Sequence, residues 1–310
     1  MWKNTVPLMA IITVCYSCNT DSNHSNQKVD QDTIQQDTIQ VVVPAITVKN
    51  LDDSKEIKVI VNTTSQVRQP ISQYSDMFRM RRFDHVTALY QELAKNTIDM
   101  CVNHNVPPAA VLSIISLESG WGNGYIGQIT GNILSLGTRK GNYELPALTL
   151  PVIIESGEVI FDPIDLGKYD SSQWEMKNRP ASLKKDYRPS HIAGSTKDLA
   201  YFKYHPEERL KARLKCINDF LTIFISEKSR ITAYREAEAK MDDIVQEGGK
   251  EALFTKQTNE IFINAIGGRP NTFNFRETWP KKVLNVIDNA GLIDLTSKMY
   301  LDNQSFMTAW

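Results

Sequence analysis

Apolar residues recur along much of the chain at the three- and four-residue spacing of an amphipathic helix. The first such run, over residues 83–102, is followed by Pro107 and Pro108, which end it and begin a second helix over Pro108–Ser119. Further apolar runs predict later helices over residues 207–227, 229–246, 250–266 and 279–290.

Two other stretches lack this helical period. Residues 149–162, TLPVIIESGEVIFD, alternate around Ser156 and Gly157, a pattern typical of a β-hairpin inside an irregular excursion between residues 137 and 190. The β-branched clusters between residues 41 and 61 predict strands or an extended strap. The pattern therefore predicts an α+β fold that is mainly α-helical, with a β-containing excursion of a length that usually carries function.

The N-terminal residues are typical of an export signal. Lys3 supplies a positive start, and residues 6–14 form an apolar stretch too short to span a bilayer. A small residue, Ser17, directly before Cys18 resembles a bacterial lipoprotein processing site. We expect residues 1–18 to be a signal peptide that leaves Cys18 as the lipid-bearing N-terminus. The alternative is an ordinary cleaved signal peptide and a secreted protein.

The remaining chain divides by composition. Residues 19–40 are polar and contain QDTIQ twice, which predicts a flexible tether because so few apolar groups cannot offset the entropy of ordering. Residues 41–74 form an N-terminal extension, and residues 75–310 hold the helical body. This organisation predicts a body held away from a lipid anchor in the cell envelope, at the outer membrane and facing the periplasm.

Charge and cysteine content exclude several classes of function. The 35 Lys and Arg residues almost cancel the 36 Asp and Glu residues, so no net field attracts nucleic acid. Cys101 and Cys216 fall on predicted apolar helix faces, where buried thiols are expected. Neither they nor the five histidines have the close spacing of a zinc site, so no metal and no cofactor is expected. Nothing in the sequence indicates an oligomeric state.

The stretch Ser116–Gly124, SLESGWGNG, places an ionisable residue at the end of an apolar helix. At 100° per residue, Val111, Ile115 and Glu118 fall within about 40° of one another, so Glu118 lies on the apolar face. Burial and the negative end of the helix both raise the pKa of the carboxyl, and a general acid needs such a retained proton. The alternative is a solvated Glu near a helix end.

Trp121 lies three residues after this acid. It offers a flat apolar face of the kind that packs against a sugar ring, and the glycines on either side let a ligand approach the backbone closely. A tryptophan after a helix also fits ordinary core packing.

The segment Leu117–Gly122, LESGWG, resembles the signature of bacterial N-acetylglucosaminidases that cut peptidoglycan, a group that includes autolysin, flagellar-rod and Bax-like hydrolases. Gly131–Gly137 resembles the family's Asn-Asn-x-Phe-Gly stretch, with Asn132 kept and the aromatic residue absent. Leu199–His205 is similar to its Phe-Arg-x-Tyr strand before a helix. The resemblance spans roughly residues 83–295. It implies a lysozyme-like helical domain with a small β lobe, a glycan held between them, and a catalytic acid in the LESGWG segment.

The second catalytic carboxylate is less sharply indicated. The family usually has a Glu four residues before the Gly of a hairpin turn; that position is Ile153 here, and the nearest acid is Glu155. Glu155 is therefore the candidate, with Glu144 and Asp162 as alternatives, although a hairpin-tip charge is the plainer interpretation of Glu155. A substrate-assisted mechanism, in which the N-acetyl group of the sugar is the nucleophile, needs no second carboxylate.

The resemblance also implies substrate contacts. Asn132 is expected to bond the acetamido group of the sugar, or else to be a turn residue after Gly131. The family's Gly-Tyr-Ala segment corresponds to Gly267–Phe273, which has no Tyr, and Tyr125 or Tyr143 is expected to take its place. Other aromatic residues are expected to line the cleft or pack in the core (Phe273, Phe275 and Trp279) or to form further sugar subsites (Tyr169 and Trp174).

These features predict a peptidoglycan glycoside hydrolase that cleaves a β-1,4 bond next to N-acetylglucosamine, with Glu118 as general acid. Its partners would be peptidoglycan glycan strands and, through a lipid anchor, a membrane. The alternatives are a lytic transglycosylase, which also needs one essential Glu, and a non-catalytic cell-wall-binding protein.

Overall fold

The computed structural model describes residues 77–137, 144–178, 185–194 and 198–310. The predicted signal peptide with Cys18, the tether and the strands of the N-terminal extension lie outside the described residues, as does Tyr143. Within the described ranges, no helix combines the length and the apolar character that crossing a membrane requires.

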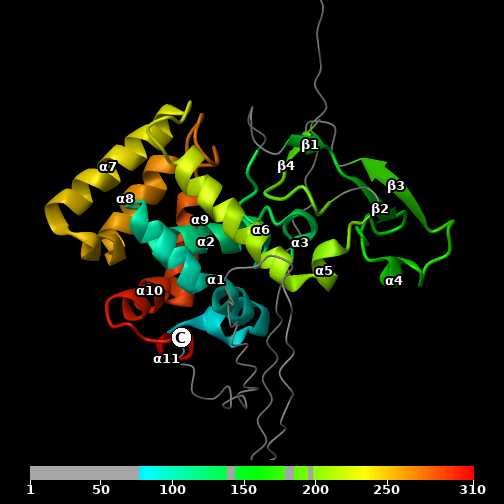
Figure 1. Cartoon of the computed structure of the whole chain (residues 1–310), viewed down its shortest axis with the longest axis horizontal. Helices are drawn as coiled ribbons and strands as arrows, with labels where there is room; N and C mark the ends of the chain where they lie inside the picture. Colours follow the sequence, from blue (N-terminus) through cyan, green and yellow to red (C-terminus); the bar gives the residue numbers. More distant parts are fainter. Residues whose placement is uncertain (1–76, 138–143, 179–184, 195–197) are drawn as a thin grey trace, which may run out of the picture. The chain divides into compact units, whose positions relative to one another are not determined.

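Helices dominate the described residues (Figure 1), and the fold is α+β and mainly α-helical, as predicted. The α-helices are α1 (Asp84–Asn103), α2 (Pro108–Ser119), α3 (Tyr125–Thr130), α4 (Pro163–Leu166), α5 (Tyr201–Tyr204), α6 (Pro206–Asp219), α7 (Thr232–Gly248), α8 (Lys256–Ile266), α9 (Trp279–Ala290), α10 (Leu292–Tyr300) and α11 (Phe306–Ala309). The short 3-10 and π turns are η2 (Arg79–Arg82), η3 (Phe220–Phe224) and η4 (Lys250–Phe254). The strands are β1 (Glu144–Pro146), β2 (Thr149–Ile153), β3 (Trp174–Asn178) and β4 (Lys185–Tyr187).

Helix α2 lies at the centre of the main hydrophobic core, and every residue from Pro108 to Ser116 is buried. It packs against α1, α8, α9 and α10. Two of its buried hydroxyls are bonded to neighbouring helices: Ser113 Oγ donates to the Val283 carbonyl of α9 at 2.7 Å, and Ser116 Oγ donates to Tyr90 Oη of α1 at 2.6 Å. A buried hydroxyl costs little folding free energy when it is hydrogen-bonded. These two bonds therefore help to hold α2 in place against α1 and α9.

The strands form two antiparallel two-stranded sheets, β1 with β4 and β2 with β3. The register of the second sheet runs from Thr149 opposite Asn178 to Ile153 opposite Trp174. A small separate core lies between this sheet and α3; its buried members are Ile129, Leu148, Leu150, Val152 and Leu199. Figure 1 shows the strands beside α3, α4 and α5, at the opposite end of the described body from α7 and α8. We call this end the β lobe (residues 144–178 and 185–194, with α5).

Helix α3 meets α6 at Gly131, the residue that ends α3 with φ +78°. A Cβ at this position would lie 2.6 Å from the Cβ of Ala212 and 3.2 Å from its backbone carbon. Only a residue without a side chain permits both this backbone conformation and this close approach. The close packing of the end of α3 against α6 therefore depends on Gly131.

The helix predictions agree with the structure where proline and glycine mark the ends. The predicted bounds of α2 and α9 are confirmed, whereas the predicted helix over residues 250–266 is divided at Thr255, which caps α8 by accepting the Thr258 N–H. Helix α10 was not predicted, because Gly291, taken only as the end of α9, is also the residue from which α10 begins.

Two β predictions need correction. The turn at Gly157 is present, and the Gly157 N–H donates to the Ile153 carbonyl at 2.8 Å. The segment after the turn, however, pairs with β2 only through a single bridge between Val159 and Val152. The strand that pairs with β2 along its length is β3. The segment after the turn is short because Asp162 begins α4. Leu199–His205, which the resemblance implied to be a strand, contains the helical turn α5, closed by the His205 N–H bond to the Tyr201 carbonyl.

Cys101 and Cys216 are buried free thiols, as expected. Burial raises the pKa of both thiols, that of Cys216 to about 12. Among the described residues, no group of three or more His, Cys, Asp or Glu side chains is placed to hold a metal ion.

Candidate active site

The glycine-rich stretch after α2 forms a sharp turn. Gly120, Trp121 and Gly122 have φ values of +56°, +53° and +79°, so three successive residues are in the left-handed region. The Trp121 N–H donates to the Ser116 carbonyl at 2.8 Å, which closes the end of α2 in a Schellman arrangement. A non-glycine residue in this region is strained, and such strain concentrates at functional sites. The turn ends the helix at Ser119, one residue after Glu118.

Glu118 is half-buried in the last turn of α2. Its Oε1 accepts a hydrogen bond from the indole Nε1 of Trp279, the first residue of α9, at 2.9 Å. Burial raises the pKa of the Glu118 carboxyl, while hydrogen bonds from Trp279 and Asn274 and the charge of Arg276 oppose that rise in part. The net direction is upward, so Glu118 keeps its proton to a higher pH than an exposed Glu does.

Of the three groups that face Glu118, Asn274 and Arg276 lie in the segment between α8 and α9, and Trp279 begins α9. The Gly268 N–H donates to the Asn274 carbonyl at 2.8 Å, and the Phe273 N–H donates to the Ile266 carbonyl at 2.7 Å. These two bonds close a loop, residues 267–278, that leads directly into Trp279. Sequence reasoning missed Asn274 and Arg276, because no local pattern marks a contact that spans so much of the chain.

The aromatic residues of this region divide between core and surface. Trp279 is only 3% exposed, and the Phe273 ring packs against it and edge-on against Phe220. Phe275, in contrast, is 68% exposed. Of the three aromatic residues expected in the cleft or the core, Trp279 is thus a core residue that also contacts the candidate acid.

Trp121 is half-buried, and its ring packs against the main core. Its indole Nε1 is buried without a hydrogen-bond partner in the described part of the chain. One side of the ring therefore contributes to the core, and stacking of a sugar on the exposed remainder stays a prediction.

Tyr125 is the first residue of α3, and Asn132 follows the end of the helix. Tyr125 begins the helix and packs, half-buried, against the small core beneath the β lobe. Asn132 is 5% exposed; its Nδ2 donates to the Leu136 carbonyl at 3.0 Å, and its Oδ1 accepts the Leu136 N–H at 2.9 Å. These reciprocal bonds give Asn132 the role of a turn residue, the second of the two interpretations offered by the sequence. Contacts of Tyr125 and Asn132 with a sugar stay predictions.

The structure does not bring Glu155 into the group of residues around Glu118. Glu155 is exposed in the turn after β2, while the side-chain partners of Glu118 come from the loop before α9 and from α9 itself. Glu144 lies in β1, where its backbone is opposite Tyr187.

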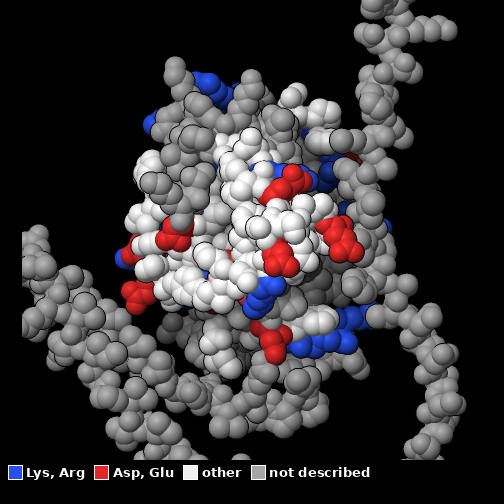
Figure 2. Space-filling model, turned by 90° about the vertical axis from the view of Figure 1, so that its right-hand side faces the viewer, with Lys and Arg blue, Asp and Glu red and all other residues white. Residues whose placement is uncertain are grey.

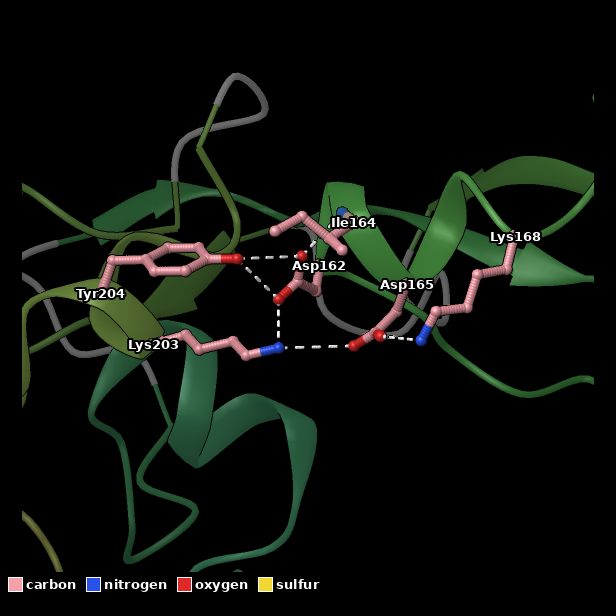
Figure 3. Close-up of polar contacts among 6 residues, drawn as sticks. All are labelled: Asp162, Ile164, Asp165, Lys168, Lys203 and Tyr204. Carbon is pink, nitrogen blue, oxygen red and sulfur yellow. Dashed lines mark hydrogen bonds and ion pairs between the residues drawn. The ribbon is translucent and has the colours of Figure 1, made fainter.

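Asp162, the other alternative for a second carboxylate, is buried in a network of its own (Figure 3). It caps α4 by accepting the Ile164 N–H at 2.7 Å, accepts a hydrogen bond from Tyr204 Oη at 3.0 Å, and forms an ion pair with Lys203. The hydrogen bond from Lys203 is the main cause that lowers the pKa of Asp162. Asp162 therefore connects α4 to α5, and its lowered pKa favours the charged form. These contacts give Asp162 a structural role, and a catalytic role for it stays a prediction.

Charged and uncharged side chains are mixed on the described surface of the β lobe (Figure 2). On the face shown in Figure 2, acidic and basic side chains are scattered among uncharged ones, as the near-neutral net charge suggests. Exposed apolar side chains of the β lobe include Ile154, Ile164 and Met176. Tyr169 is 36% exposed and Trp174 is half-buried, so both are partly accessible, and their role as sugar subsites stays a prediction.

Glu118 does not line either of two surface pockets. The larger, of 910 Å³, is formed by the end of α8, the glycines that follow it and the outer face of α9; the smaller, of 470 Å³, lies beside the start of α7. Arg269 contributes to both, and Glu118 contributes to neither. The glycan cleft expected beside Glu118 therefore stays a prediction.

No protein-family model and no curated protein matches this chain. Among solved structures, the catalytic domain of the autolysin Auto from Listeria monocytogenes is similar, with a TM-score of 0.38 and 12% sequence identity over 68% of this chain and 87% of that chain. The likeness is coarse and assigns no residue a role.

Proposed function

We propose that this protein is a peptidoglycan glycoside hydrolase that cleaves a β-1,4 bond next to N-acetylglucosamine, with Glu118 as general acid. The observation that carries the proposal is the half-buried carboxyl at the end of α2, whose pKa is raised by burial. A carboxylic acid that keeps its proton to a higher pH than usual can deliver it to a leaving oxygen. The LESGWG segment that holds this acid supports peptidoglycan as the substrate.

In the proposed reaction, Glu118 donates its proton to the glycosidic oxygen as the bond between this oxygen and the anomeric carbon breaks. The positive charge that develops on the sugar ring is stabilised by a nucleophile on the opposite face, and water then completes the hydrolysis. The Glu118 carboxylate left after the first step accepts a proton from that water. Trp121 and Tyr125 would contact sugar rings, and Asn132 would keep the turn beside α3 in place.

The identity of the nucleophile separates two forms of the mechanism. Glu155 is exposed and outside the contacts of Glu118, which favours a substrate-assisted route in which the N-acetyl group of the sugar attacks the anomeric carbon. Under this route Glu155→Gln keeps most of the activity. If Glu155 is the nucleophile or base, the same variant loses activity to the extent that Glu118→Gln does.

The test is digestion of purified sacculi by the Glu118→Gln variant, followed by mass spectrometry of the released sugars. General acid catalysis contributes on the order of 10²- to 10⁴-fold, so the variant should lose about that factor in rate. Glu238→Gln is the matched control, because Glu238 on α7 is also half-buried with a pKa raised by burial but takes no part in the site. The proposal fails if Glu118→Gln digests sacculi as fast as the Glu238→Gln control.

The digestion products distinguish the alternative functions. A reducing-end N-acetylglucosamine supports hydrolysis, whereas an anhydromuramic end identifies a lytic transglycosylase. If the wild-type protein releases no sugar but sediments with sacculi, the chain is a binding protein.

We also propose that the protein is anchored in the cell envelope by a lipid on Cys18, as the Ser17-Cys18 pair suggests. Metabolic labelling with a radioactive fatty acid should mark the wild-type protein and leave Cys18→Ala unlabelled. Equal labelling of both proteins would contradict the anchor, and recovery of unlabelled wild-type protein in the medium would identify a secreted form.

A further inference from the structure

The hydrogen bond between Trp279 and Glu118 connects residues that are 161 positions apart in the sequence. Its donor is an indole N–H, which has no acceptor capacity and does not titrate in the working range of an enzyme. Oε1 of Glu118 is therefore an acceptor whether the carboxyl is protonated or not. The carbonyl oxygen of a protonated carboxyl is its better acceptor, so this bond favours the proton on the other oxygen, Oε2.

The position of the indole ring is closely defined. A Cβ on Gly267 would lie 2.1 Å from Cε3 of Trp279, so the ring lies directly against the Gly267 backbone. A Cβ on Gly268 would lie 2.9 Å from Cγ of Pro280, the residue after Trp279. The Phe273 ring contacts the indole with a centroid distance of 5.5 Å. These contacts leave the ring little freedom to turn away from Glu118.

We propose that Trp279 is a positioning residue, which holds Oε1 of Glu118 as an acceptor so that Oε2 is the oxygen that delivers the proton to the substrate. Gly267 and Gly268 have no side chains, and this leaves the space that the indole ring and Pro280 occupy. The inference rests on the proposed function of Glu118, and it assigns to Trp279 an effect on the proton without contact with the substrate.

The charged surroundings of Glu118 set the expected pH effect. Arg276 is the charged group that faces Glu118 from the loop before α9, and Asn274 and Trp279 contribute neutral hydrogen bonds. Each of these groups favours the carboxylate, so loss of the indole donor raises the pKa of Glu118 further. A general acid is active while protonated, so the basic limb of the pH–rate profile moves to higher pH.

The first experiment compares Trp279→Phe with Trp310→Phe on sacculi across a range of pH. The control also removes an indole N–H bond, from Trp310 Nε1 to Thr87 Oγ1 at 3.1 Å, at a site that does not contact Glu118. We expect Trp279→Phe to lower the turnover rate about tenfold, the equivalent of one hydrogen bond, and to move the basic limb to higher pH. A loosened core that admits water would move the limb to lower pH. That result, or an unmoved limb, overturns the proposal.

A second measurement needs no enzymatic activity and no stable variant at position 279. The full chain has five tryptophans, and ¹⁵N-tryptophan labelling resolves their indole N–H signals by NMR. The signal of Trp279, identified by its loss in Trp279→Phe or by sequential assignment, should shift with pH as Glu118 titrates, and the shift should vanish in Glu118→Gln. A Trp279 signal that does not follow Glu118 refutes the positioning role.

The two proposals fail separately. If Glu118→Gln retains activity while the Trp279 signal follows the titration of Glu118, the contact is present but the proposed function is wrong. If Glu118→Gln is inactive and Trp279→Phe matches Trp310→Phe in rate and pH profile, the function stands and the positioning role is wrong.

Discussion

A glycine-to-alanine series tests how the β-lobe side of the structure is joined to α6. Gly131 has φ +78°, and a Cβ there would lie 2.6 Å from Ala212. Gly157 has a similar φ of +71° but nothing within 4 Å of the added Cβ, and Gly137 has neither a positive φ nor a close neighbour. The three positions thus separate backbone strain from steric overlap.

The expected magnitudes follow from this comparison. Every variant gains the same entropic benefit from restricting the unfolded chain, so Gly137→Ala is the baseline. The free energy of unfolding of Gly157→Ala should be lower than that of Gly137→Ala by about 1–2 kcal/mol, the cost of a left-handed conformation for alanine. Gly131→Ala should lose the same amount of stability and about 1–3 kcal/mol more, because its new Cβ overlaps with α6. Its total of about 2–5 kcal/mol corresponds to roughly 4 to 20 °C in Tm for a domain of this size.

Thermal and urea unfolding followed by circular dichroism measure these differences. Ala212→Gly in the background of Gly131→Ala removes the atom that the new Cβ meets, so the double variant should recover part of the loss beyond additivity. If Gly131→Ala and Gly157→Ala are destabilised equally, or if the double variant shows no coupling, α3 and α6 do not pack at Gly131 as described.

The remaining predictions concern the pH dependence of stability. Burial raises the folded-state pKa of Glu118, so wild-type stability declines as pH rises from about 4.3, the ordinary Glu value, through the raised folded pKa. Glu118→Gln should not show this decline and should melt at a higher temperature than wild type at neutral pH; a lower Tm would contradict the burial of the charge. The pKa of Asp162 is lowered in the folded protein, so its charge stabilises the fold above about pH 3.9, the ordinary pKa of Asp. This stabilisation is lost as pH falls toward the pKa of Asp162 in the folded protein. Asp162→Asn should therefore be less stable than wild type at pH 7, with a smaller difference at pH 3, and an equal difference at both would refute the ionic role.

The sequence was sufficient where local chemistry decides the structure. Proline at the first turn and glycine after the last residue marked the bounds of α2 and α9. The helical period placed Glu118 on an apolar face, and the structure agrees that it is half-buried with a raised pKa. These features depend on residues within a few positions of one another, so they can be read from a single chain.

The parts that were missed depend on distant contacts. Trp279 has the local pattern of a core residue, and only the packing of α9 against α2 makes its N–H a partner of Glu118. Asn132 also donates from Nδ2 to the Tyr187 carbonyl of β4 at 3.5 Å, a contact that the residues around Asn132 do not indicate. Asp162 precedes a proline in an irregular segment, and its ion pair with Lys203 of α5 has no signal in the sequence around it.

The bond between Trp279 and Glu118 also sets the order in which the site can be completed during biosynthesis. The ribosome makes Glu118 long before Trp279, and all of the helices from α3 to α8 are made between them. A nascent chain that stops before α9 contains the acid but lacks both its indole partner and the helix that covers it. Glu118 thus gains its Trp279 partner only after the helices from α3 to α8 have been synthesised.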